Sequence, residues 1–188
     1  MNQEEKAVLT GGTPEHWPQG TQMTLDSKRA TLLVFTHPHC SCTRATLTEL
    51  NRLMVRYPER IAANILVINP EKNRPQSGLW GKSGVAVHED TNGSEAHRFG
   101  AKTSGFVVFY APSGKLLFKG GIAEGPGHKG DNAGAKAILA LLSGQNPTSN
   151  ATPVYGCALV GRAEASPEAL NDAPNGHTIV SATEAAKN

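Results

Sequence analysis

The 188-residue sequence predicts an α/β fold, in which a mixed sheet of four to five strands has helices on both faces. Three observations predict it: short apolar and β-branched runs, segments with apolar residues at helical spacing, and one clear hairpin. Along the chain these segments follow the order strand, helix, strand, helix, hairpin and helix. Right-handed crossovers make the first two strands parallel, and the hairpin adds two antiparallel strands.

The first half of the chain alternates between strand and helix. Residues 1–30 are polar and contain several Gly and Pro residues, which predicts an extended lead-in. The apolar run at residues 31–35 predicts a buried strand, and apolar residues at helical spacing predict a helix over 43–57. Residues 61–68 form the next predicted strand, and residues 85–87 form a short edge strand.

The second half contains the hairpin and the last helix. Residues 91–99 predict a brief helix, and residues 106–118 predict a hairpin with its turn at Ala-Pro-Ser-Gly. The last predicted helix presents apolar residues on one face over 135–142, with Asp131 or Asn132 as its N-cap.

These elements predict one compact domain with a tail. We expect a single domain over residues 31–144, since a chain of this size can bury roughly 70% of its unfolded surface. Residues 145–188 lack an amphipathic period and predict a mostly disordered tail. One part of that tail, residues 153–160, is apolar enough to dock on the domain.

Charge and apolar runs give no reason to expect a nucleic acid partner or a membrane span. Lys and Arg number 18 against 16 Asp and Glu, so the net charge of +2 gives no reason to expect a nucleic acid partner. No run approaches the roughly 18 apolar residues of a membrane span, and the first twenty residues lack the apolar core of a signal peptide. From the sequence as it stands we expect a soluble chain.

The chemistry of the chain centres on its cysteines. There are three, Cys40, Cys42 and Cys157, so at most one intramolecular disulfide can form and one thiol is left over. The first two lie where a strand passes into a helix, and the N-terminus of a helix stabilises a thiolate. His37 and His39 flank them and can add charge or hydrogen bonds. We therefore expect Cys40 to be acidic and reactive.

The predicted topology brings three loops to one end of the sheet. They are the loop after the first strand, the turn at residues 103–105 and the glycine-rich stretch at 120–131, which carries His128. In a thiol–disulfide exchange reaction Cys40 would be the nucleophile, and Cys42 or Cys157 would resolve the mixed disulfide. His39 or His128 would tune thiolate formation.

The sequence resembles the thioredoxin-like superfamily, and specifically the small thioredoxin-like proteins labelled RedB. The motifs that carry the resemblance are LVFTHPHCSCTR at 33–44, TSG at 103–105, GGI at 120–122, GH at 127–128 and GDNAG at 130–134. The resemblance implies a thiol–disulfide exchange or redox-sensing protein whose partners are protein thiols and disulfides or a redox partner protein. It also implies an extracytoplasmic, membrane-tethered location. Whether the chain is an enzyme, a thiol–disulfide oxidoreductase, stays open.

Two departures from ordinary thioredoxins bear on the site. Cys40 takes the nucleophile position, so the usual second cysteine of a CxxC motif falls on Thr43 and a CxC motif stands instead. Thr103 and Ser104 stand where thioredoxins carry a cis-proline facing the motif. A proline lacks an N–H group, so Ser104 supplies a backbone donor, and we expect these two residues to leave room for a ligand or metal.

Two alternatives to redox chemistry remain. Exchange requires no cofactor, but two soft thiolates suit Cu(I) or Zn, which would make the protein a metal carrier or sensor without turnover. The candidate ligands are Cys40, Cys42, His37, His39 and His128, with Cys157 as a further sulfur. In the third interpretation the fold serves only as an interaction scaffold.

Overall fold

The computed structural model describes residues 12–38, 40–68, 83–123 and 132–159, and all structural statements below refer to these. They form one five-stranded sheet in the order β3-β2-β1-β4-β5, with three helices. The strands are β1 (Ala30–Thr36), β2 (Ile61–Ile68), β3 (Val85–Asp90), β4 (Phe106–Tyr110) and β5 (Leu116–Gly121). The helices are α1 (Ser41–Arg56), α2 (Ser94–Arg98) and α3 (Ala133–Leu142).

The sheet is mixed, as the sequence predicts. β1 pairs in parallel with β2, which pairs in parallel with the edge strand β3. On the other side β1 pairs antiparallel with β4, and β4 pairs antiparallel with β5. The α/β fold class is therefore confirmed, with five strands.

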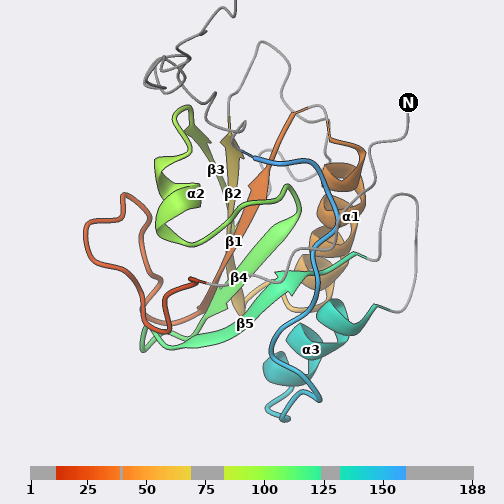
Figure 1. Cartoon of the computed structure of the whole chain (residues 1–188). Coiled ribbons are helices and arrows are strands. Elements are labelled where there is room, and N and C mark those ends of the chain that lie inside the picture. The colour runs from red at the N-terminus through yellow and green to blue at the C-terminus, as the bar shows by residue number, and fades with distance from the viewer. Residues whose placement is uncertain (1–11, 39, 69–82, 124–131, 160–188) are drawn as a thin grey trace, which may run out of the picture.

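Helices cover both faces of this sheet. α1 and α3 lie on one face and α2 lies on the other (Figure 1). The alternation of side chains along β1 explains the two layers, because Leu32 and Val34 belong to the core under α1 and α3. Leu33 and Phe35 point to the opposite face and belong to the core under α2. All four side chains are fully buried, so β1 is the central strand that holds the two layers together.

Local sequence explains where the helices begin. The side chain of Asn132 accepts a hydrogen bond from the backbone N–H of Ala135 at 2.6 Å, so Asn132 is the N-cap of α3. α2 is shorter than the predicted helix because Gly93, at a positive φ of 66°, precedes its first turn. α1 begins at Ser41, two residues before the predicted start, and Cys40 is its N-cap residue in an extended conformation.

A segment after α3 runs back along the sheet. We call residues 150–159 the strap; it follows β5 and then reaches the carboxyl end of β1, where α1 begins (Figure 1). Backbone hydrogen bonds join Thr152 to Lys119 of β5 at 3.1 Å and Leu159 to Lys102 at 3.0 Å. The side chains of Val154 and Leu159 are 1% exposed and pack into the core under α2. The strap thus crosses from the edge of the sheet to the cysteine end.

Candidate thiol site

Cys40 lies where β1 ends and α1 begins. The backbone N–H of Cys40 donates to the carbonyl of His37 at 3.2 Å, and the carbonyl of Cys40 accepts from the N–H of Thr43 at 3.1 Å. These two bonds make the tight turn that places the thiol at the N-terminus of the helix. The residue is only 5% exposed, so its sulfur is largely screened from solvent.

The thiol of Cys40 is more acidic than an ordinary cysteine. Burial alone would raise the pKa of this thiol, but hydrogen bonding from Cys157 opposes burial and lowers it. The amide of Cys42 and the hydroxyl of Ser104 lower it further, and the balance is a Cys40 pKa below the ordinary value of 9.0. Donors aimed at the sulfur stabilise the charged form, so Cys40 forms a thiolate more readily than an ordinary cysteine.

A buried serine ties the cysteine turn to the neighbouring loop. The hydroxyl oxygen of Ser104 accepts a hydrogen bond from the backbone N–H of His37 at 2.9 Å. It also lies 2.9 Å from Oγ1 of Thr43, which donates to the carbonyl of His37 at 3.0 Å. Ser104 is 0% exposed and Thr43 is 1% exposed. The hydroxyl that stands in place of a second CxxC cysteine therefore helps to fix the turn.

The strap completes the site from the other side. The backbone N–H of Cys157 donates to Sγ of Cys40 at 3.4 Å. The carbonyl of Cys157 accepts from the N–H of Ser104 at 2.8 Å. Sequence reasoning expected that N–H of Ser104 to be available to a ligand or metal; in the structure it is used by the strap. Thr103 forms an antiparallel bridge with Ala158, so the strap also occupies this part of the loop.

The three cysteines are not joined by disulfides, and their thiols differ in accessibility. Cys42 is 3% exposed and lies in the first turn of α1, whereas the side chain of Cys157 is exposed. Cys40, Cys157, Thr103 and Ser104 come together at one end of the sheet.

Only one of the three predicted site histidines lies among the described residues. His37 belongs to the cysteine turn, whereas His39 and His128 lie outside the described residues. Among the residues that the structure describes, no three His, Cys, Asp or Glu side chains are grouped so that they could hold a metal ion. The Cu(I) or Zn interpretation therefore stays a prediction.

Sequence reasoning missed one group of the site, the backbone N–H of Cys157. The sequence does carry a signal for it, because Gly156 precedes that cysteine. A Cβ at position 156 would overlap the carbonyl oxygen of Ser104, so only glycine lets the strap approach this closely. A glycine beside a cysteine in an apolar segment is thus a sign of close backbone packing.

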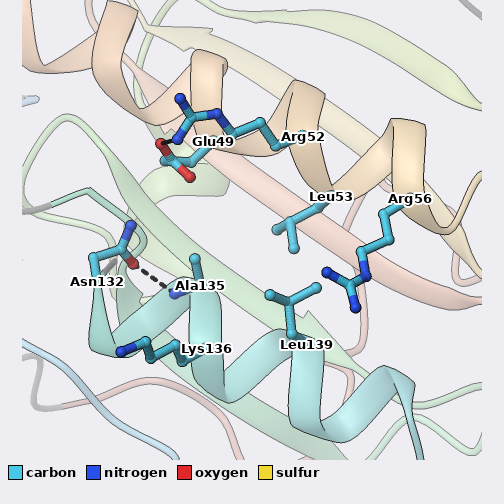
Figure 2. Close-up of a pocket in the computed structure, with 8 residues that line it drawn as sticks. All are labelled: Glu49, Arg52, Leu53, Arg56, Asn132, Ala135, Lys136 and Leu139. Atoms are coloured by element: carbon cyan, nitrogen blue, oxygen red, sulfur yellow. Dashed lines mark hydrogen bonds and ion pairs between the residues drawn. The ribbon is translucent and has the colours of Figure 1, made fainter. Parts of the chain in front are cut away.

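A pocket of about 270 Å³ lies between α1 and α3, away from the thiols (Figure 2). It is lined by Glu49, Arg52, Leu53, Arg56, Asn132, Ala135, Lys136 and Leu139. Burial raises the pKa of the Glu49 carboxyl above its ordinary value, although Arg52, at 2.6 Å, opposes the shift. Glu49 follows Cys40 by nine residues, which is roughly 13 Å along a helix. The pocket therefore contains none of the predicted site residues.

Comparison of the sequence with known proteins gives no assignment. No family model matches the chain, and no curated protein is significantly similar to it. Among the described residues, no helix combines the length and the apolar character needed to cross a bilayer.

Comparison of the structure with solved structures identifies the fold. An uncharacterized conserved protein from Geobacillus kaustophilus superposes with a TM-score of 0.58 and 19% identity, over 73% of this chain and 80% of that one. A hypothetical protein from Sinorhizobium meliloti gives a TM-score of 0.56 and 21% identity, over 71% and 80% of the two chains. A thioredoxin-like protein in its oxidised form gives a TM-score of 0.49 and 13% identity, over 76% of this chain and 98% of that one. The two structures with TM-scores above 0.5 share the fold of this chain, and the strand order with helices on both faces is the thioredoxin-like arrangement that the sequence predicts.

Proposed function

We propose that this protein is a thioredoxin-like thiol–disulfide exchange or redox-sensing protein of the RedB type, acting through the CxC motif at the start of α1. The observation that carries the proposal is the environment of Cys40. Its sulfur lies at a helix N-terminus, accepts an N–H from Cys157 at 3.4 Å and has a lowered pKa. The thiolate is the form of cysteine that attacks disulfides, so these contacts favour exchange.

The proposed chemistry proceeds in two steps. The Cys40 thiolate attacks one sulfur of a partner's disulfide, so that a mixed disulfide forms and the partner's other sulfur leaves as a thiolate. A second thiol of this chain then attacks Cys40, closes an intramolecular disulfide and releases the partner in its reduced form. Cys42 and Cys157 are the two candidates for this resolving thiol. In the reverse direction the same two steps reduce the disulfide of this protein and oxidise two thiols of the partner.

The proposed partners are protein thiols and disulfides, and the proposed location is extracytoplasmic. Both come from the resemblance of the cysteine motif and its surrounding loops to RedB proteins. His39 or His128 is proposed to tune thiolate formation. No cofactor is needed, because the electron pair moves between sulfurs.

The proposal is tested with a small disulfide as the partner. Reduced protein is mixed with oxidised glutathione, and its mass is followed over time for the wild type and for Cys40→Ser. We expect the wild type to form a glutathione adduct or an internal disulfide, and Cys40→Ser to react much more slowly. Cys42→Ser and Cys157→Ser are run beside it, because each removes one candidate resolving thiol but keeps Cys40, so each should still form the glutathione adduct on Cys40. Equal rates for Cys40→Ser and the wild type would contradict Cys40 as the nucleophile.

A further inference from the structure

The nucleophilic sulfur is covered by the chain's own backbone. Cys40 is 5% exposed, and the backbone nitrogen of Cys157 lies 3.4 Å from its Sγ. A disulfide must approach the attacking sulfur closely, so an external disulfide cannot reach Cys40 while the strap lies against it. The strap therefore has to move before the first step of exchange.

The strap is built so that its middle can move while its ends stay attached. Val154 and Leu159 are buried in the core under α2. Between these anchors, the residues at 155–158 are half-buried or exposed. The hydrogen bond from Ser104 to the carbonyl of Cys157 and the bond to Cys40 hold this middle part. Loss of these few contacts would uncover Cys40 without removing the anchors from the core.

The same movement concerns a second thiol. Because an N–Cα bond is about 1.46 Å long, the Cα of Cys157 lies within about 4.9 Å of the Cys40 sulfur. The thiol of Cys157 also hydrogen-bonds to the Cys40 thiol, so the two sulfurs already lie close together and only a small adjustment is needed to join Cys40 and Cys157. Cys42 is instead buried at 3% exposure in the first turn of α1, where it moves only with the helix.

We propose that the strap is a gate over Cys40 and that Cys157, which the gate carries, is the resolving thiol. This rests on the proposed function, with a disulfide RSSR as the oxidant. When the gate is open, Cys40 attacks RSSR, forms Cys40–S–S–R and releases RS⁻. When it closes, the Cys157 thiolate attacks the Cys40 sulfur, the Cys40–S–S–R bond breaks and a second RS⁻ leaves. In total two protein thiols lose two electrons and two protons, and RSSR becomes two RSH.

The gate is tested with Gly156→Val, which places a side chain against the carbonyl of Ser104. Ala151→Val is the control, because it places the same valine side chain at an exposed strap position. Both are made in a Cys42→Ser, Cys157→Ser background, so that Cys40 is the single thiol. The readout is the rate of alkylation by iodoacetamide as a function of pH.

We expect Gly156→Val to raise the limiting rate of Cys40 alkylation at high pH about tenfold. The closed position of the strap loses about one net hydrogen bond, so the open position becomes more populated. The apparent pKa of Cys40 should also rise, because the backbone N–H at position 157 no longer reaches the sulfur. The control should change neither quantity. An equal limiting rate for Gly156→Val and its control would overturn the gate. Should Gly156→Val fail to fold, Gly156→Ala is used, because its Cβ meets the same Ser104 carbonyl; it should shift the rate in the same direction, and an unchanged rate would overturn the gate.

The resolving thiol is tested by oxidation with oxidised glutathione and peptide mapping. We expect Cys42→Ser to form the Cys40–Cys157 disulfide and Cys157→Ser to stop at the glutathione adduct of Cys40. Closure of a Cys40–Cys42 disulfide in Cys157→Ser at the wild-type rate would overturn the assignment of Cys157. If no variant, Gly156→Val included, forms an adduct on Cys40, the proposed function fails, whereas the alkylation experiment still decides the gate.

Discussion

Replacing Ser104 by Ala should weaken both the fold and the thiolate. The hydroxyl accepts from the N–H of His37 and bonds to Thr43, both at 2.9 Å, in a residue that is 0% exposed. Thr43 keeps its bond to the carbonyl of His37, so the main loss is the partner of one N–H group. A buried donor without a partner costs about 1–3 kcal/mol.

The expected loss can be converted into a melting temperature. For a protein of this size, 1 kcal/mol lowers the thermal midpoint by about 2–4 °C, so a loss of about 2 kcal/mol corresponds to about 4–8 °C. Because the Ser104 hydroxyl also lowers the pKa of Cys40, the same variant should raise that pKa. The assays are thermal unfolding under reducing conditions and the pH profile of Cys40 alkylation.

The matched control for this variant is Ser143→Ala. Ser143 is exposed at the end of α3, and its hydroxyl donates to the carbonyls of Leu139 and Ala140 at 2.9 Å. Its loss should stay within about 0.5 kcal/mol, as for other surface substitutions. The reasoning is refuted if Ser104→Ala melts within the range of this control and leaves the alkylation profile of Cys40 unchanged.

Three further predictions concern stability and metal binding. In the reduced protein the free energy of unfolding should rise with pH between the lowered Cys40 pKa and the ordinary value near 9.0. This contribution should be lost as the pH falls through the lowered pKa. Urea unfolding over this range should show the rise in the wild type and none in Cys40→Ser. Asn132→Ala should cost about 0.5–2 kcal/mol in the same urea assay, because it removes the N-cap bond to Ala135, and a loss near zero would contradict that role. Protein purified under reducing conditions should carry no stoichiometric copper or zinc by elemental analysis; bound metal that Cys40→Ser loses would favour the carrier interpretation over exchange.

The sequence predicted best the strands that are buried on both faces. The bounds of β2 and β4 coincide with the predicted runs at 61–68 and 106–110, because a continuous apolar run has few alternatives to a buried strand. Predictions were poorer at the edges of the sheet. β3 extends beyond the predicted 85–87 to Asp90 through polar residues, since an edge strand needs less apolar surface.

β5 shows why pairing partners far along the chain defeat local reasoning. Its predicted end was residue 118, but the strand continues to Gly121. β4 pairs with β5 as far as Gly121, which stands opposite Phe106, and on the outer side the N–H of Gly121 donates to the carbonyl of Pro153 in the strap at 3.2 Å. Two adjacent glycines are poor strand formers, yet a Cβ at Gly120 would overlap Thr152, so this edge requires glycine.

For the candidate site, local sequence predicts the position of the cysteine but not its long-range contacts. The position of Cys40 at a helix N-terminus follows from a strand run, a cysteine and a helical period within a few residues. The contacts of its sulfur do not follow, because Cys157 lies 117 residues away. The sequence could bring loops to one end of the sheet, but it could not decide which backbone donor would reach the thiol.

The position that follows Cys42 decides how exchange can finish. In a CxxC motif a second thiol would stand at Thr43, one helical turn from the nucleophile. Here a hydroxyl stands there, and its bonds to His37 and Ser104 hold the turn that presents Cys40. That hydroxyl cannot resolve a mixed disulfide, so a resolving thiol has to come either from the buried Cys42 or from outside the helix. A strap that already donates to the Cys40 sulfur, and carries an exposed thiol on the donating residue, meets that requirement with little movement of the core.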